Sequence, residues 1–338
     1  MIKKCKTMRQ SNVELCRIAS ILLVLIVHSN FAYLGWPNTL EDTTIYNLLL
    51  QGLSIIGVNV FILITGYFST FPKKKSLINL FATIVFYGVL LLGAVIYNGN
   101  FTYKSLFLIS SSNWFILDYL GLLLLCPFLN SYIDNASKNN FKIALLSLLV
   151  YYIWFGYLPG FNADFNHGYS ILSFVVIYLI GRYIRLYGIN WIKHPACIFA
   201  LCTVALGAMG YISLKYNIGM NTIRGSKWLD TKVFCYNNPI VILSSVSFFM
   251  FFLNLKINPS KFINHVSKSC LAILLIHTSP GVSPLLRTYF NKITEIPSNT
   301  LYVLTYVGGV VAIFATCVLI DQIRLKFFEI LRIYYKKL

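Results

Sequence analysis

The stretch Asn12-Val-Glu-Leu-Cys-Arg-Ile-Ala-Ser-Ile-Leu-Leu-Val-Leu-Ile-Val-His28 decides the fold, because it predicts a helix that is apolar around most of its circumference. Such a helix is buried in a large protein or spans a membrane. Its ionisable residues are Glu14, Arg17 and His28. Arg17 and His28 are separated by close to three helical turns, so both side chains fall on one face, about 16 Å apart along the axis.

The depth of His28 is the second feature of this stretch. Residues 18–27 are all apolar or small, which places His28 well inside a bilayer with no local partner. An ionisable group at that depth is costly and is by default a hypothesis for a functional site. A lone His is more simply interpreted as a neutral side chain that hydrogen-bonds another helix. Because Arg17 lies in phase with His28, we favour the functional interpretation for this pair.

The composition extends the membrane prediction to the whole chain. Of 338 residues, 57% are hydrophobic and only 11% charged, and the mean hydropathy is +0.71. These values predict an all-α, polytopic transmembrane helix bundle. The connections are too short for a soluble catalytic domain, so we expect one integral membrane domain over residues 1–338. The cysteines form no C-x-x-C pair, and we expect neither a metal site nor a disulfide framework.

Hydropathy predicts about ten membrane helices. They lie near residues 12–34, 45–70, 76–97, 113–133, 143–160, 169–187, 195–214, 236–255, 269–288 and 300–323. The segments 143–160 and 269–288 are the least well defined, because each contains or ends in Pro or Gly.

The net charge of +18 bears on orientation rather than on nucleic-acid binding. The basic residues are scattered between apolar segments, so we interpret them as orientation signals and contacts with the lipid bilayer, with no nucleic-acid partner. Most of them fall in connections on one side of the predicted bundle. The positive-inside rule therefore places both termini in the cytoplasm and Arg17 near the cytoplasmic face of the cell membrane. We expect the tail after Asp321 to lie along the inner interface.

The second predicted helix carries small and polar residues, and their role can be interpreted in two ways. Gly57 and Gly66 permit close helix approach, and Thr65 can hydrogen-bond across helices. The alternative is an anion pocket at the cytoplasmic mouth, formed with the basic turn that follows. Its candidate residues are Thr65, Gly66, Lys73, Lys74 and Lys75.

Further candidate site residues lie at membrane depth. Asp118 is a carboxylate about one turn into the membrane on the outer side. It either belongs to a functional site or simply caps the helix or pairs with a basic residue. His277 is a second histidine at membrane depth. The Pro280-Gly281 break that follows must be buried in protein or line a cavity. Two such histidines favour a polar site inside the bundle.

The connection 215–235 is the longest outer one. It carries four basic residues together with Trp228 and Asp230. It is either a binding surface for an anionic or glycan acceptor or an ordinary solvated loop.

These residues resemble acyltransferase family 3, integral membrane proteins that include the O-acetyltransferases of bacterial surface polysaccharides. Arg17 and His28 follow the family's Arg/Lys-x10-His pattern. The ordered set continues with Gly57-Val-x-x-Phe-x-x-x-Thr65-Gly-Tyr67, Trp114-Phe115 through Pro127 and Asn130, and Leu275-Ile-His277. The family often has Ser where this chain has Thr65, and Tyr where it has Leu274.

The resemblance implies transfer of an acyl group, most often acetyl, from cytoplasmic acyl-coenzyme A to a sugar hydroxyl. Arg17 and the three lysines 73–75, with Glu14 beside Arg17, would bind the donor phosphates. His28 would act as general base or carry the acyl group covalently, with His277 and Asp118 as further catalytic candidates. No cofactor would be bound permanently, because acetyl-CoA is a substrate.

Two other functions stay open at this point. In a transporter or flippase of a glycan precursor, the same ionisable residues would form a substrate or proton pathway, with helices broken near Pro127 and Pro280. Many secondary transporters contain an inverted repeat, and this chain has no convincing one. A polysaccharide polymerase would need larger outer loops.

Overall fold

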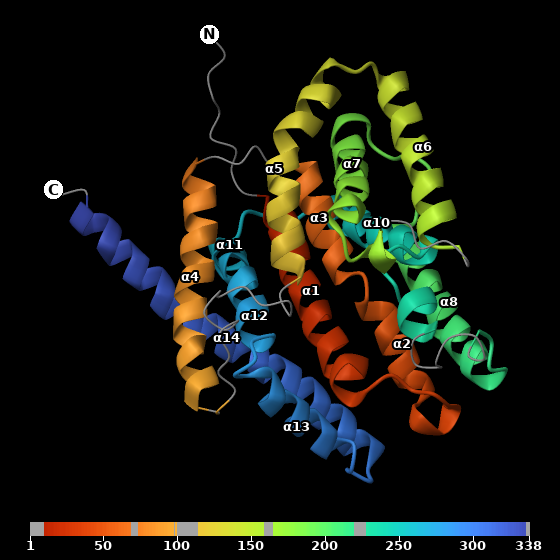
Figure 1. Ribbon diagram of the computed structural model, residues 1–338, viewed down its shortest axis with the longest axis vertical. Coiled ribbons are helices and arrows are strands. Elements are labelled where there is room, and N and C mark those ends of the chain that lie inside the picture. The colour runs from red at the N-terminus through yellow and green to blue at the C-terminus, as the bar shows by residue number, and fades with distance from the viewer. Residues whose placement is uncertain are drawn as a thin grey trace.

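The computed structural model describes residues 10–68, 74–97, 99, 114–158, 165–219 and 228–335, and these residues form an all-α bundle without a strand (Figure 1). The fold class predicted from the sequence is therefore confirmed. The helices are α1 (Ser11–Val27), α2 (Ile45–Ser54), α3 (Gly57–Tyr67), α4 (Lys74–Tyr97), α5 (Trp114–Asn135), α6 (Lys138–Gly156), α7 (Ile171–Tyr187), α8 (Pro195–Lys215), α10 (Pro239–Asn254), α11 (Lys261–Val266), α12 (Cys270–His277), α13 (Ser283–Ile293) and α14 (Asn299–Tyr335). Short helical turns connect them: η1 (His28–Ala32), η2 (Leu40–Asp42), η5 (Asn166–Gly168), η6 (Leu229–Val233) and η7 (Ser267–Ser269).

All ten predicted membrane segments are helical, although they differ in length and continuity. Within the described chain, 6 helices are long and apolar enough to cross a membrane: residues 11–32, 45–67, 77–97, 114–135, 195–215 and 299–330. Helices α7 and α10 are shorter, with 17 and 16 residues. The segment 269–288 is divided at the predicted Pro280-Gly281 break. Helix α12 ends at His277, before Pro280, and α13 begins at Ser283, after Gly281.

Helix α1 lies in the middle of the bundle, where it contacts α2, α3, α10, α11, α12 and α14 (Figure 1). On one side of it, α3 packs against α7 and α10, and α8 packs against α2 and α10. On the other side, α12 packs against α4 and α14. This central position explains the sequence of α1: a helix surrounded by other helices has to be apolar in every direction.

The tight crossing of α3 and α7 depends on two glycines. A side chain at Gly66 would collide with the backbone carbonyl of Tyr178, and one at Gly181 would collide with the carbonyl of Leu63. Small residues at such positions let two helix backbones approach closely, which is the main source of packing energy between membrane helices. The close-approach interpretation of Gly66 is therefore the one that its surroundings support.

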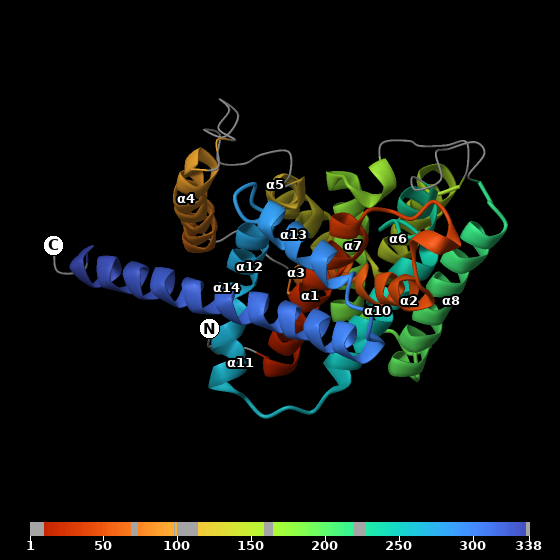
Figure 2. The ribbon, with the colours of Figure 1, turned by 90° about the horizontal axis from the view of Figure 1, so that it is seen from below.

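One predicted helix end is wrong, that of α14. Helix α5 ends at Asn135, close to the predicted end at residue 133, and it runs unbroken through Pro127, where a transporter pathway would have needed a break. Helix α14 does not end near residue 323 but continues as one helix to Tyr335, and its C-terminal part extends away from the bundle (Figure 2). Its continuation is supported by an ion pair one turn apart, in which Arg324 Nε lies 2.6 Å from Asp321 Oδ1.

Candidate functional site

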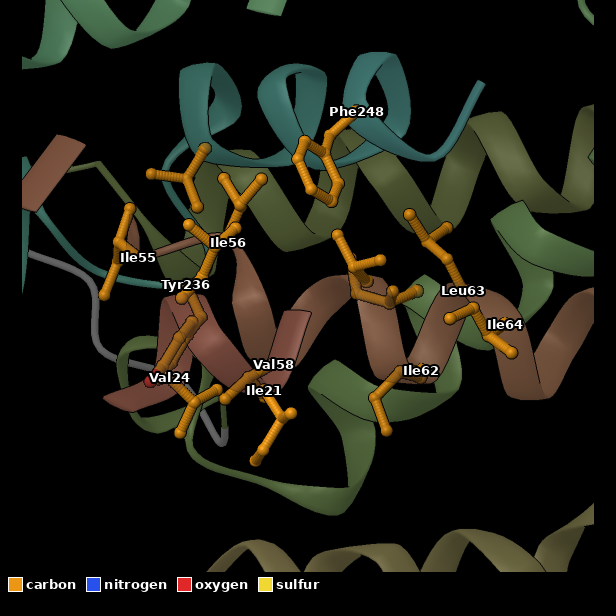
Figure 3. Close-up of a cluster of buried hydrophobic side chains, with 14 of the residues drawn as sticks. Ile21, Val24, Ile55, Ile56, Val58, Ile62, Leu63, Ile64, Tyr236 and Phe248 are labelled. Carbon is orange, nitrogen blue, oxygen red and sulfur yellow. The ribbon is translucent and has the colours of Figure 1, made fainter. Parts of the chain in front are cut away.

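A cavity of about 510 Å³ runs alongside α1 and is lined by both ends of that helix. Its walls come mainly from α1, α2, α3, α5 and α12, with two residues each from η1 and η7 and one each from α4 and η6. Part of the apolar wall is visible in Figure 3, where Ile21, Val24, Val58 and Tyr236 lie near one another. We name the two ends of the cavity the Arg17 end and the Trp36 end, after residues that line them.

His28 lines this cavity at the point where α1 changes its helical form. The α-helix ends at Val27, and His28 begins the π-helical turn η1. Single π-helical turns inside α-helices are frequent at functional sites. The turn is tied to α2 by Asn30, whose Nδ2 donates to the Asn47 carbonyl at 2.9 Å and to Gln51 Oε1 at 3.1 Å. His28 therefore sits on a locally irregular but anchored segment.

His277 is brought directly to His28 by the packing of α12 on α1. His28 Nδ1 lies 2.9 Å from His277 Nε2, and the His277 side chain is fully buried. On its other side, His277 Nδ1 is hydrogen-bonded to the carbonyl of Ile273, one turn earlier in α12. Tyr33 donates a further bond to the His277 carbonyl at 3.1 Å. The second histidine is thus held at both ring nitrogens.

These contacts assign the protons of the neutral pair. A carbonyl can only accept, so His277 Nδ1 carries a proton and donates it to Ile273. A neutral imidazole has one N–H, so His277 Nε2 is an acceptor and His28 Nδ1 donates to it. His28 Nε2 then has the free lone pair. His277 is not among the lining residues, and its ring is linked to the cavity by the hydrogen bond with His28.

The Arg17 end of the cavity is lined by Glu14, Arg17 and Lys268. Arg17 Nε lies 3.4 Å from Glu14 Oε2, and 30% of the Arg17 side chain is exposed. Lys268, which follows α11 in the turn η7, is exposed. Two cations and one anion make this end a suitable place for a phosphate group. In the sequence, Lys268 is one of many basic residues in the connections, and no motif around it distinguishes it from the others.

The other donor-binding candidates are placed differently. Thr65 lines the cavity and donates its hydroxyl to the Phe61 carbonyl at 2.9 Å. Gly66 packs on α7 and does not line the cavity. Lys73 lies outside the described residues, and Lys74 and Lys75 form the first turn of α4.

Asp118 is not brought to the two histidines or to the cavity. Trp114, Phe115 and Tyr119 line the cavity from α5, whereas Asp118 of the same helix is not among the lining residues. The helical period alone does not separate it from them, since Asp118 is four residues after Trp114 and three after Phe115.

The Trp36 end of the cavity combines aromatic rings with one carboxylate. Trp114, Tyr169 and Tyr236 pack against one another, with ring centroids 4.5 to 5.7 Å apart. Asp230, in the turn η6, lines the same end of the cavity. Burial raises the pKa of Asp230 to about 6, and the carboxylate makes no hydrogen bond or ion pair with the described part of the chain. The sequence marked Asp230 only as a member of a basic connection.

Comparison with known proteins identifies the family of the chain. No curated protein and no solved structure matches the chain significantly. The acyltransferase domain family, by contrast, matches residues 10–322, which cover every element that lines the cavity. The match extends over nearly the whole chain and includes Arg17, His28 and His277. The chain belongs to acyltransferase family 3 and is a membrane acyltransferase.

Proposed function

We propose that this acyltransferase transfers an acyl group, most simply acetyl, from cytoplasmic acyl-coenzyme A to a hydroxyl of a cell-surface or exported polysaccharide or glycolipid. The observation that carries the proposal is the shared cavity: His28, with a free lone pair at Nε2, lies in the same cavity as the cationic pair Arg17 and Lys268. A donor with phosphates and a long flexible arm fits such a cavity, since its charged part can stay at the Arg17 end while its thioester reaches His28.

The chemical step follows from the protons of the histidine pair. His28 Nε2 takes the proton of the acceptor hydroxyl as the acceptor oxygen forms a bond to the thioester carbonyl carbon. The carbon–sulfur bond then breaks, and the leaving thiolate takes the proton back from His28 Nε2. The products are an ester and free coenzyme A, and His28 returns to its starting form.

His277 has a positioning role in this proposal. While His28 is protonated, its Nδ1–H donates to His277 Nε2, and a hydrogen bond from a charged donor is about twice as strong as a neutral one. The bond therefore stabilises His28 most at the moment when it holds the extra proton. It also fixes the orientation of the imidazole ring, so that Nε2 is directed away from α12.

Direct transfer is the route we propose, in preference to an acyl group carried on His28. Residues from the Arg17 end, from the His28 position and from the Trp36 end line one common cavity, so donor and acceptor can be bound together. A covalent relay would be needed if the two substrates had to occupy the site in turn. Kinetics with both substrates varied distinguish these routes: direct transfer gives intersecting lines in a double-reciprocal plot and a relay gives parallel lines.

We further propose that the protein is in the cell membrane with both termini in the cytoplasm. This orientation places the Arg17 end next to the cytoplasmic pool of acyl-coenzyme A and the Trp36 end toward exported glycans. It rests on the distribution of Lys and Arg among the connections. Reporter fusions after residues 11 and 335 should both be active in the cytoplasm, and one after residue 219 outside.

The test of the function uses membranes from the source organism with the gene deleted, reconstituted with purified protein and radiolabelled acetyl-CoA. We expect label in the glycan fraction that alkaline hydroxylamine releases, because an oxygen ester is cleaved by alkaline hydroxylamine and an amide is not. Movement of a glycan precursor across the membrane without any transfer of label would identify a transporter or flippase instead.

A further inference from the structure

We infer that the Trp36 end of the cavity is the acceptor subsite and that it takes an uncharged sugar ring, which stacks on aromatic side chains while Asp230 accepts hydrogen bonds from its hydroxyls. This inference rests on the proposed function and goes beyond it, because it assigns the acceptor's place in the molecule and its chemical class.

The two ends of the cavity differ in charge. Arg17 and Lys268 are at one end with Glu14, whereas Asp230 at the other end has no cationic partner among the described residues. The anionic donor is attracted to the Arg17 end and repelled from the Trp36 end. The Trp36 end is therefore left for the second substrate.

The carboxylate of Asp230, which has no ion-pair partner in the part of the chain that the structure describes, also restricts what that substrate can be. Asp230 lies close enough to Tyr169 and Tyr236 to repel the ionised forms of their hydroxyls. It would repel a carboxylate or phosphate on the acceptor in the same way. An ionised carboxylate is an acceptor of up to four hydrogen bonds. Neighbouring hydroxyls of a neutral sugar supply such donors.

The aromatic residues supply apolar surface of the shape that a sugar ring needs. Trp36 lines the cavity and packs on Phe31 and Phe234, with ring centroids 5.1 and 6.1 Å away. These contacts keep the indole in place. Binding pockets of this kind combine apolar and aromatic walls with a few polar groups that fix orientation. Gln51 and Ser54 of α2 are further neutral polar residues on the same wall.

The experiment measures transfer from radiolabelled acetyl-CoA with extracted membranes of the deletion strain as the source of natural acceptor. The amounts of acetyl-CoA and of extract are varied separately for the wild type, Asp230→Asn and Trp36→Leu. We expect the half-saturating amount of extract to rise about 10- to 100-fold in Asp230→Asn, as for the loss of hydrogen bonds to a charged group. The half-saturating concentration of acetyl-CoA should stay within about twofold.

Matched controls come from residues away from the cavity. Glu41→Gln removes a carboxylate from an exposed position between α1 and α2, and Trp191→Leu removes an indole that is 67% exposed. Neither should change either half-saturation value. Unchanged donor saturation also shows that the two test variants are folded, and Trp36→Leu provides an independent test if Asp230→Asn does not fold.

Three outcomes would overturn the inference. Equal half-saturation by extract in the wild type and both test variants would exclude this end as the acceptor subsite. A lower value in Asp230→Asn would mean that the acceptor is anionic. Label recovered only in a sugar-free fraction would exclude a sugar. Absence of any transfer by the wild type would instead refute the proposed function, and the inference with it.

Discussion

His28 and His277 are 249 residues apart in the chain and share one hydrogen bond, 2.9 Å from Nδ1 of the first to Nε2 of the second. The bond joins the turn η1, at the end of α1, to the last residue of α12. Because His277 is itself bonded to the Ile273 carbonyl, the direction of the bond is determined, and the lone pair of His28 is left at Nε2. The predictions about chemistry depend on this relationship.

The first prediction concerns His28. Replacement by Ala should lower the rate of acyl transfer about 10²- to 10⁴-fold, the usual effect of losing a general base, while donor binding stays near normal. His28→Gln should be equally inactive, because Gln can replace a structural hydrogen bond but cannot take a proton. Transfer is measured with radiolabelled acetyl-CoA, and His194→Gln, at an exposed position before α8, is the control. A near wild-type rate in His28→Gln would make His28 a packing residue.

The second prediction separates the role of His277 from that of His28. His277→Leu leaves the His28 Nδ1–H without its partner and should lower kcat about 10- to 100-fold, with both KM values unchanged. His277→Gln should restore most of kcat, since its amide can accept from His28 and donate to Ile273. If His277→Gln were as impaired as His28→Gln, His277 would have to take part in the proton transfer itself.

The third prediction concerns donor binding at the Arg17 end. Arg17→Ala should raise the Kd of acetyl-CoA about 10- to 100-fold, because it removes charge-assisted hydrogen bonds. Arg17→Lys should retain part of the affinity, since the charge remains but the planar fork is lost. Calorimetry at two salt concentrations provides the measurement, and affinity should fall as salt rises. Lys261→Ala removes an exposed basic residue at the start of α11 and should have no effect. Unchanged affinity in Arg17→Ala would show that Arg17 only pairs with Glu14.

The fourth prediction concerns pH. Burial raises the pKa of Asp230 to about 6, so its carboxylate is ionised above pH 6 and protonated below it. Because the ionised form accepts hydrogen bonds from the sugar, the half-saturating amount of acceptor should rise as pH falls below about 6. Burial raises the pKa of Tyr169, Tyr236 and Cys235, which keeps these neighbours neutral in that range.

The same pH series on a variant checks which group is responsible. In Asp230→Asn, acceptor saturation should be weak and independent of pH between about 5 and 8, while any pH dependence of kcat should remain. Burial lowers the pKa of Lys232, two residues away, so Lys232→Met is the companion variant. If acceptor saturation lost its pH dependence in Lys232→Met and kept it in Asp230→Asn, the lysine would be the titrating group.

The fifth prediction concerns a buried polar network between α4 and α14. Asp321 Oδ1 accepts from Arg324 Nε at 2.6 Å and from the Tyr87 hydroxyl at 2.8 Å. Arg324 also donates to Thr83 at 3.1 Å. Asp321 and Arg324 are both buried. Asp321→Asn should therefore lower the free energy of unfolding by about 3–5 kcal/mol, since it leaves a buried charge without its partner.

Thermal unfolding in detergent micelles measures this effect. Tyr87→Phe removes one hydrogen bond and should cost only about 0.5–1.5 kcal/mol. Acetyl-CoA affinity at low temperature should be unchanged in both variants, because none of these residues lines the cavity. Equal stability of Asp321→Asn and the wild type would show that the network is not important for packing α4 on α14.

The features that the sequence by itself determined are local or compositional. The apolar composition predicted helices across a membrane, and the helical period placed Arg17 and His28 on one face of α1, where both line the cavity. The small residues Gly57 and Gly66 predicted close helix contacts, and both glycines lie where a side chain would collide with a neighbouring helix. Such features depend only on residues within a few turns of one another.

Only the tertiary structure decided which residues from distant segments meet. It paired His277 with His28, brought Asp230 and Lys268 to opposite ends of one cavity, and left Asp118 outside that cavity. It also buried Arg324, which the sequence had assigned to an interfacial tail. Helices that are apolar on all sides do not reveal by their period which face meets which neighbour. That choice is made by the shapes of the packed helices and by the need of each buried polar group for a partner.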